Sequence, residues 1–209
     1  MRGAGADGVL PVDKPVGPTS HDVVARARRA LDTGRIGHTG TLDPFASGLL
    51  LLCVGPATRL SEYLTALEKS YVAVARLGVG TDTLDPEGAV VERSDSWSEL
   101  DRARIEEASA SFLGRREQVP PQFSAKKVGG EAMYARARRG ERVELSPIPV
   151  EIHELELLGV DLPDVRLRIR CSSGTYVRAL ARDLGAALGE PAHLAELRRT
   201  AVGSFRVQD

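Results

Sequence analysis

Apolar and polar residues alternate most regularly between Val165 and Cys171, where arginines occupy every second position. Successive side chains of a strand point to opposite faces, so the pattern predicts a strand with one core face and one basic face. The preceding segment, residues 149–160, is also typical of a strand. We therefore expect these two segments to form a strand pair.

The run from Leu49 to Val54 is apolar throughout, which predicts a strand that is buried on both faces. Pro120 and Pro121 break regular structure, so residues 118–130 are expected to form a surface loop. Neighbouring strands with interspersed helices favour an α+β fold over a doubly wound parallel sheet. The other expected elements are strands 8–13 and 71–78 and helices 20–31 (capped by Ser20), 57–67, 97–113 (capped by Ser96 or Ser98), 131–139 and 175–188.

Composition places the chain among globular proteins. Its 209 residues are 42% hydrophobic and 27% charged, which suits one large or two small domains with a substantial core. The longest apolar stretch is too short to span a bilayer, and the N-terminus lacks the apolar segment of a secretory signal. We therefore expect a cytoplasmic protein that has no membrane partner.

The cysteines and histidines give no sign of a metal site or a disulfide framework. Cys53 and Cys171 each lie in a strand-like apolar segment, which predicts two buried, reduced thiols. The four histidines have no metal-ligand spacing with the cysteines or with each other. We expect no bound metal.

Charge is distributed unevenly along the chain, although the net charge is only −1. Residues 115–142 carry eight basic and three acidic side chains, whereas residues 81–107 carry nine acidic and three basic ones. The basic segment is consistent with an RNA-binding surface. It is equally consistent with a solvated helix face that is stabilised by ion pairs between successive turns, so both interpretations stay open.

The segment 37–50, GHTGTLDPFASGLL, places a single carboxylate, Asp43, in a glycine-rich loop just before the apolar run. Pro44 favours an extended backbone at Asp43 and prevents a helix from passing through it. Taken alone, an Asp-Pro pair more often forms a turn in which the aspartate binds its own backbone. The alternative is that the loop holds the Asp43 carboxylate in position as a nucleophile.

Motifs for several other reactions are absent. The sequence contains no GxxxxGK[ST], HExxH or GxSxG motif, which argues against nucleotide hydrolysis, zinc proteolysis and serine hydrolysis. Carboxylate chemistry and RNA binding are the two classes that remain, and one protein can combine them.

Several motifs in order resemble those of the TruB-type tRNA pseudouridine synthases. They are VDKP at 12–15, GHTGTLDPFASGLL at 37–50, KSY at 69–71, PPQFSAKK at 120–127, SSGTYVRALARDLG at 172–185 and LRRTAVGSF at 197–205. The resemblance covers nearly the whole chain. It implies a pseudouridine synthase fold over residues 1–209, with a mixed, mainly antiparallel central sheet flanked by helices and RNA-binding loops.

The resemblance also implies an activity, the isomerisation of uridine 55 in the T loop of transfer RNA to pseudouridine. The base is flipped out, cut from C1′ at N1, rotated and rejoined through C5 without a metal or organic cofactor. Asp43 takes the position of the catalytic aspartate, and either attack on C1′ or removal of a C2′ proton remains possible. An anion suits the positive character that develops at C1′ when a glycosidic bond breaks.

Five other residues match substrate-binding positions of the family. Tyr71 would stack on the target uracil near C5, and Arg178 would pair with Asp43 and keep it ionised. Tyr176 resembles a supporting pocket aromatic. His38 would lie near the flipped nucleotide, and Asp85 would contact the uridine, although an acidic surface turn is a strong alternative for Asp85.

Base flipping costs a few kcal/mol, on the order expected for unstacking, and phosphate contacts can offset that cost. Lys14 would support the catalytic loop or contact the RNA backbone, with simple surface exposure as the alternative. The other expected backbone contacts are Lys126, Lys127, Arg136 and Arg139.

The chain ends a few residues after LRRTAVGSF, so the C-terminal RNA-binding domain of the family is expected to be absent. One rival hypothesis is a tRNA-binding or tRNA-folding factor in which chemistry is secondary. Another is a related synthase that acts on a different RNA under guidance by other proteins. We expect a monomer that acts on the T stem-loop of transfer RNA.

Overall fold

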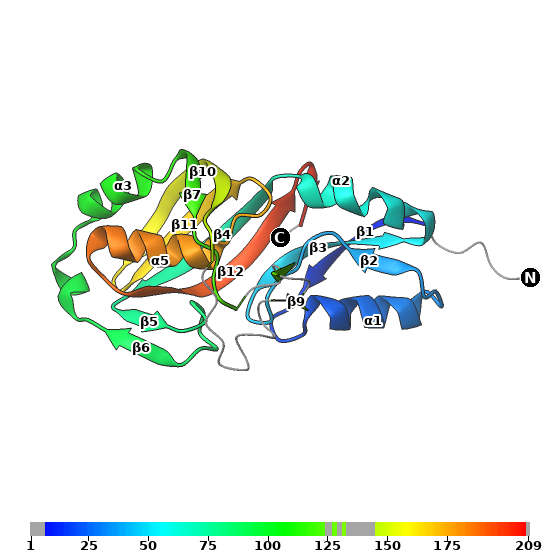
Figure 1. Ribbon diagram of the computed structural model, residues 1–209, viewed down its shortest axis with the longest axis horizontal. Helices are drawn as coiled ribbons and strands as arrows, with labels where there is room; N and C mark the ends of the chain where they lie inside the picture. The colour runs from blue at the N-terminus through cyan, green and yellow to red at the C-terminus, as the bar shows by residue number, and fades with distance from the viewer. Residues whose placement is uncertain (1–6, 124–126, 129–130, 133–144, 208–209) are drawn as a thin grey trace, which may run out of the picture. The chain divides into compact units, whose positions relative to one another are not determined.

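The structure is a computed structural model that describes residues 7–123, 127–128, 131–132 and 145–207. It divides into two compact units, one formed by Met1–Val72 with Leu197–Asp209 and the other by Ala73–Glu196 (Figure 1). Two strands, β4 (Lys69–Leu77) and β12 (Ala192–Val202), contribute residues to both units. The expectation of one catalytic domain over residues 1–209 stays a prediction.

The strand β3 (Ser47–Val54) organises the first unit. It pairs antiparallel with β1 (Gly8–Lys14) over seven residues and with the short β2 (Ile36–His38). It also pairs in parallel with β12, where Arg198 lies beside Ser47 and Arg199 beside Gly48. Every residue from Gly48 to Val54 is buried, as the apolar run predicts, and β13 (Phe205–Arg206) folds back onto β12.

The helix α1 (Ser20–Ala30) forms where it is expected, but its cap differs from the prediction. Thr19 is the N-cap, and it forms a capping box in which its side chain accepts the Asp22 amide while Asp22 accepts the Thr19 amide. Ser20 is instead the first helical residue, because its hydroxyl binds the backbone of Leu42. The expected helix 57–67 consists of η1 (Gly55–Leu60), a 3-10 helix, and α2 (Ser61–Ala66).

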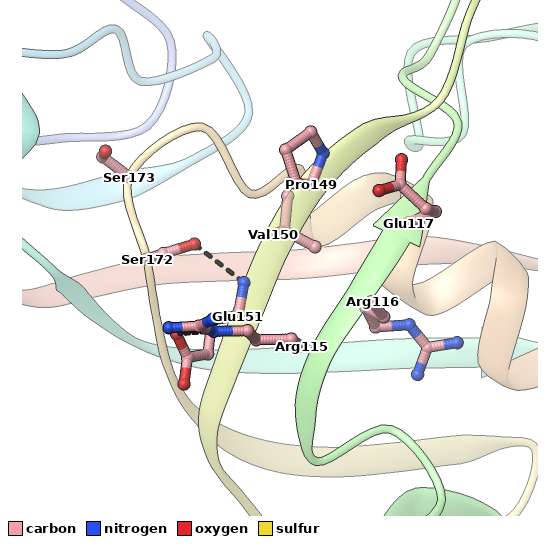
Figure 2. A pocket seen from close by; sticks show the side chains of 8 residues that line it. All are labelled: Arg115, Arg116, Glu117, Pro149, Val150, Glu151, Ser172 and Ser173. Carbon is pink, nitrogen blue, oxygen red and sulfur yellow. Dashed lines mark hydrogen bonds and ion pairs between the residues drawn. The ribbon is translucent and has the colours of Figure 1, made fainter.

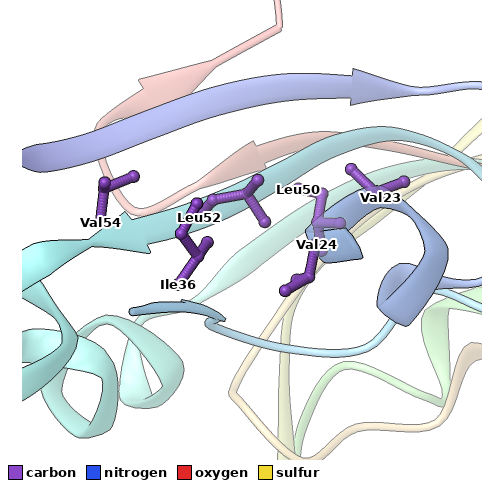
Figure 3. Close-up of a cluster of buried hydrophobic side chains, with 6 residues drawn as sticks. All are labelled: Val23, Val24, Ile36, Leu50, Leu52 and Val54. Atoms are coloured by element: carbon purple, nitrogen blue, oxygen red, sulfur yellow. The ribbon is translucent and has the colours of Figure 1, made fainter. Parts of the chain in front are cut away.

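One core cluster of the first unit lies between α1 and the strands (Figure 3), and a second one contains Leu49, Leu51 and Val202. Val23 and Val24 of α1 pack against alternate residues of β3 and against β2, and Ala27 and Leu31 extend the contact. Helical periodicity predicts a buried stripe that also includes Ala30, but Ala30 is exposed, so the prediction holds for the other four residues. The buried members of the cluster are Val23, Val24, Ile36, Leu50, Leu52 and Val54.

The second unit is built on β10 (Ile148–Asp161), which pairs antiparallel with β11 (Asp164–Cys171) and with β7 (Gly114–Gln118). The pair β5 (Val79–Thr81) and β6 (Val90–Arg93) is also antiparallel. These pairings confirm the predicted α+β class with mainly antiparallel strands. The remaining elements of this unit are η2 (Ser96–Glu99), α3 (Arg102–Ala110), α5 (Val177–Leu188), β8 (Lys127–Val128) and β9 (Glu131–Ala132).

The two faces of β11 behave as its alternation predicts. Val165, Leu167, Ile169 and Cys171 are buried, and the arginines between them lie on the opposite face. That face is less basic than the sequence of β11 alone indicates, because β10 supplies glutamates opposite the arginines, giving the ion pairs Arg168–Glu156 and Arg170–Glu154. Exposed pairs of this kind contribute about 0 to 1 kcal/mol each.

Two helix predictions need correction. The expected helix 97–113 divides at Leu100, which is extended, and α3 is capped by Asp101 rather than by a serine. Residues Glu131 and Ala132, expected to begin a basic helix, form β9 and pair with β8. The rest of that expected helix, residues 133–139, lies outside the described residues.

Two further sequence predictions concern thiols and membranes. Cys53 and Cys171 are both buried thiols rather than members of a disulfide, as predicted. Among the described residues, no helix combines the length and the apolar character that are needed to cross a membrane.

We predict that Gly48→Ala destabilises the protein by about 2 to 4 kcal/mol, because it combines a strained backbone with a steric overlap. Gly48 has a φ of +102°, and an added Cβ would lie 2.2 Å from the carbonyl oxygen of Arg199. Gly34→Ala is the matched control, since a Cβ there meets nothing within 4 Å. Urea unfolding measures both variants, and equal midpoints would contradict the prediction.

Candidate active site

Asp43 lies in the loop that joins β2 to β3, and it is partly exposed. Its carbonyl accepts the amide of Ala46 at 3.1 Å, which makes residues 43–46 a turn with proline at the second position. The Asp-Pro turn and the positioned carboxylate are therefore compatible, because the hydrogen bond that closes the turn uses the backbone carbonyl of Asp43.

Ser20 fixes the residue that precedes Asp43. Its hydroxyl accepts the amide of Leu42 at 2.9 Å and donates to the carbonyl of Leu42 at 3.1 Å. Both Ser20 and Leu42 are buried. On the other side of Asp43, the Gly17 amide donates to the Pro44 carbonyl at 2.8 Å. The backbone of the catalytic candidate is thus held on both sides from the segment 17–20.

Lys14 is fully buried, and its ammonium group donates to the carbonyls of Pro15, Pro18 and Pro44. These distances are 2.9, 2.8 and 3.4 Å. The ammonium group therefore supports the Asp43 loop, which is one of the two roles we expected. The other expected role, contact with the RNA backbone, does not fit a side chain without exposed surface, and simple surface exposure is wrong.

Arg199 is a positioning residue that the sequence reasoning missed. Its buried guanidinium donates to the carbonyls of Leu49, Gly40 and Thr41 at 2.7, 3.1 and 3.4 Å. It thus links β12 to the Asp43 loop and to the start of β3. A signal was available, since Leu197 and Ala201 have the spacing of one strand face and Arg199 lies between them on that face.

Two other predicted residues, Tyr71 and His38, belong to the first unit. Tyr71 lies in β4 and is buried, with 7% of its surface exposed. His38 ends β2, and its Nδ1 accepts the Gly40 amide at 3.4 Å. The ring of His38 meets that of His21 edge to face, with centroids 5.4 Å apart. Burial lowers the pKa of His38, and the charges of His21 and Arg199 lower it further.

Arg178 and Asp85 form a buried ion pair in the second unit, with Nη1 3.0 Å from Oδ2. The guanidinium also donates to the carbonyls of Thr83 at 2.9 Å and Phe123 at 2.8 Å. The other oxygen of Asp85 accepts the Thr83 hydroxyl and the amide of Glu87. Asp85 is therefore not a solvated residue of an acidic surface turn, because its carboxylate anchors Arg178.

Tyr176 immediately precedes α5 and is held by Gln118 of β7. The Tyr176 amide donates to Oε1 of Gln118 at 2.9 Å, and Nε2 of Gln118 donates to the Tyr176 carbonyl at 3.2 Å. Gln118 is buried, with 1% of its surface exposed. The side-chain amide thus acts like one residue of a neighbouring strand and fixes the start of the helix that carries Arg178, a role that the sequence does not reveal.

A pocket of about 560 Å³ lies between β7, β10 and the segment after β11 (Figure 2). Its charged groups are partly paired, because Arg115 contacts Glu151 and the Arg116 guanidinium lies 3.9 Å from the centre of the Phe112 ring. The Ser172 hydroxyl accepts the Glu151 amide at 2.9 Å. The first two arginines of the basic segment 115–142 therefore lie on the rim of a groove with balanced charge.

The structure divides the predicted site residues between its two units. Asp43, Tyr71 and His38 belong to the first, and Arg178 and Tyr176 belong to the second together with Asp85. The pairing of Arg178 with Asp43 stays a prediction. The side chains of Lys126, Lys127, Arg136 and Arg139 lie outside the described residues, so their expected phosphate contacts also stay predictions. The part of the chain that is described contains no cluster of three or more metal-binding side chains.

Family models match almost the whole chain. The N-terminal domain model of the TruB family of pseudouridylate synthases matches residues 28–177. The C-terminal domain model of tRNA pseudouridylate synthase B matches residues 178–209.

Curated relatives named tRNA pseudouridine synthase B are similar over most of their own length. The relative from Thermobifida fusca is 52% identical, over 97% of this chain and 72% of the relative. The relative from Opitutus terrae is 49% identical, over 97% of this chain and 84% of the relative.

Solved structures give a concordant result. A chain of a Cbf5-Nop10-Gar1 complex is similar with a TM-score of 0.74 and 32% identity, covering 96% of this chain and 50% of that one. A chain of an H/ACA RNP bound to a substrate RNA containing 2'-deoxyuridine has a TM-score of 0.70 and 31% identity, covering 96% and 49%. The present chain thus spans about half the length of those two chains.

We predict that Ser20→Ala lowers the free energy of unfolding by about 2 kcal/mol, because the amide and the carbonyl of Leu42 lose their buried partner. Ser98→Ala is the control, since its hydroxyl bond to Asp95 is exposed. Urea unfolding compares the two variants. If Ser20→Ala lowers the free energy of unfolding no more than Ser98→Ala does, solvent replaces the Ser20 hydroxyl without loss of stability, and the prediction is wrong.

We predict that the His38 imidazole titrates below its ordinary pKa of 6.5, because burial disfavours the charged ring. Since the unfolded chain binds the proton first, the contribution of His38 to stability is complete above pH 6.5 and declines as the pH falls toward the folded pKa. Imidazole NMR gives the midpoint. His21→Gln should move it part of the way back up, and a midpoint at or above 6.5 would contradict the assignment.

Proposed function

The chain belongs to the TruB family of pseudouridylate synthases, and from this premise we propose that its substrate is uridine 55 in the T loop of transfer RNA. The reaction breaks the bond from C1′ to N1, turns the freed uracil within the site and joins C1′ to C5, where a proton leaves. Substrate and product are isomers, so the reaction consumes no second reactant.

Asp43 is the proposed catalytic residue, and the observation that supports it is the support of its loop. Lys14, Ser20 and Arg199 bind backbone groups on both sides of it, which fixes the backbone that carries its carboxylate. A carboxylate so placed stabilises positive charge at C1′, whether it attacks C1′ or removes a proton from C2′. Both routes remain open in this proposal.

The base must be extruded before the carboxylate can reach C1′, which costs a few kcal/mol, about the loss of one stacked and paired position. We propose that Tyr71 stacks on the extruded uracil and that Tyr176 and His38 contribute further contacts to it. Stacking on an aromatic ring contributes about 1 to 3 kcal/mol per base, which is comparable with the cost. Lys126, Lys127, Arg136 and Arg139 are proposed to bind the RNA backbone.

Arg178 is proposed to keep the catalytic aspartate ionised, and this assignment rests on the family motif GTYVRAL rather than on geometry. The structure adds a reason why an arginine suits the position. Its guanidinium already binds Asp85 and two carbonyls, so its orientation is fixed. A lysine ammonium could not replace these planar, divergent donors.

Transfer RNA is favoured over a guided RNA substrate by the similarity itself. The relatives named tRNA pseudouridine synthase B are about 50% identical to the chain over most of their length, whereas the Cbf5 complex chain is 32% identical over half of its own. We further propose that the protein acts without a partner protein and as a monomer. Cytoplasmic residence stays a prediction.

We predict that Asp43→Asn abolishes release of tritium from C5-labelled uridine in an isolated T stem-loop, because the amide can neither stabilise charge at C1′ nor accept a proton. Binding of the stem-loop should change less than about threefold, since the two side chains are isosteric. The matched control is Asp32→Asn, at an exposed position with a φ of 46° that asparagine also adopts.

The outcomes of this assay separate the hypotheses. Tritium release from the bare stem-loop supports a stand-alone tRNA synthase. Refolding of transfer RNA without tritium release would identify a binding or folding factor, and release that requires added proteins would identify a guided synthase. Loss of binding in Asp43→Asn would make Asp43 a structural residue instead.

A further inference from the structure

A second pocket, of about 380 Å³, lies in the second unit beside the C-terminal end of α5. We call it the Glu190 pocket. Leu84, Val91, Ala186 and Pro191 contribute apolar wall to it, and Val91 belongs to β6. Its volume is at the small end of the range of ligand sites, which suits a side chain or a small molecule rather than a folded partner.

Glu190 is the unusual residue of this pocket. It is buried, with 5% of its surface exposed, and among the described side chains its Oε2 is a buried oxygen without a hydrogen-bond partner. A carboxylate in that position costs several kcal/mol, about the effective penalty of burying an uncompensated ion, unless a donor reaches it. A buried acceptor that lines a cavity therefore indicates a ligand that brings the donor.

The position of Glu190 is fixed by the end of α5. Gly189 adopts the left-handed conformation with a φ of 81° and donates to Ala186, and the Glu190 amide donates to the Gly185 carbonyl at 2.9 Å. Such a helix end satisfies the last carbonyls of the helix. Pro191 follows and restricts the backbone further. The carboxylate is therefore presented from a rigid backbone.

The charges around the pocket favour a cation. Glu92 of β6 adds a second carboxylate to the lining. Arg182 is the basic side chain among the lining residues, and its charge is compensated by Asp183 at 2.7 Å, while it also donates to the Val119 carbonyl at 3.0 Å. The segment 81–107, which contributes Thr81, Leu84, Val91 and Glu92 to the lining, carries nine acidic and three basic residues, which raises the local concentration of cations. The same charges repel a phosphate chain.

We propose that the Glu190 pocket binds an organic cation, namely an ammonium or guanidinium group on an aliphatic stem. The head group donates charge-assisted hydrogen bonds to Oε2 of Glu190, with Glu92 at the rim, and the stem contacts Val91, Ala186 and Pro191. The cation is either a free diamine or the side chain of a lysine or arginine in another protein. This site is independent of the proposed synthase activity and uses none of its residues.

Calorimetric titration at low salt tests the proposal with putrescine and agmatine as free cations and N-acetyl-arginine amide as a side-chain model. We expect binding of at least one probe by the wild type, and a loss of about tenfold or more in Glu190→Gln, because charge-assisted bonds become neutral ones. The control Glu92→Gln should lose only about twofold, since an exposed carboxylate contributes little. Preference for agmatine or putrescine over the arginine amide would identify a free diamine site.

A second variant tests the proposal even if Glu190→Gln does not fold. Val91 is 67% exposed on β6 and lines the pocket, so Val91→Lys places a tethered ammonium there without disturbing the core. It should compete with the free probes and weaken their binding at least about tenfold. Equal affinity in the wild type and Glu190→Gln, or no binding of any probe at about 10 mM, would overturn the proposal.

Discussion

The first unit depends on two buried cations that bind backbone carbonyls. Lys14 and Arg199 are both withdrawn from solvent, and each donates to oxygens of the loop that carries Asp43. A buried charge is tolerated when its hydrogen-bond donors are satisfied, and the surrounding carbonyls contribute acceptors for them. Polar contacts to the loop backbone therefore contribute to its order.

The second unit also contains a buried cation, which forms an ion pair with a carboxylate. Arg178 is also buried, and it pairs with the carboxylate of Asp85 and donates to the carbonyls of Thr83 and Phe123. Breaking such a pair by removing one partner is strongly destabilising, by about 3 to 5 kcal/mol, since the remaining charge stays buried. Both units thus hold buried cations of the candidate site through hydrogen bonds to several acceptors.

Most of the fold could be predicted from hydrophobic periodicity. The apolar run of β3, the alternation of β11 and the buried stripe of α1 agree with the structure, because in each case side-chain burial sets the period. The polar strand β7 and the short strand β2 could not be predicted, since long-range pairing forms them. The helix cap was misplaced because Ser20 has a tertiary partner that competes with the capping role.

Site residues that belong to a sequence motif could be predicted, whereas residues that act through contacts distant in the sequence could not. Asp43 and Arg178 were found from their motifs, but Arg199 and Gln118 were missed because their partners are backbone atoms distant in sequence. Lys14 was identified correctly as a residue of interest, yet only its burial distinguishes loop support from RNA contact.

The parallel contact of β12 with β3 also has a consequence for how the protein matures. Gly48 lets the backbone of Arg199 approach closely enough for the guanidinium to reach Gly40 and Thr41, and these partners are separated by most of the chain. During synthesis the N-terminal part emerges first. A nascent chain that already contains the complete aspartate motif therefore still lacks the strand that holds the Gly40–Thr41 part of the loop, so the loop gains this support only after β12 has been synthesised.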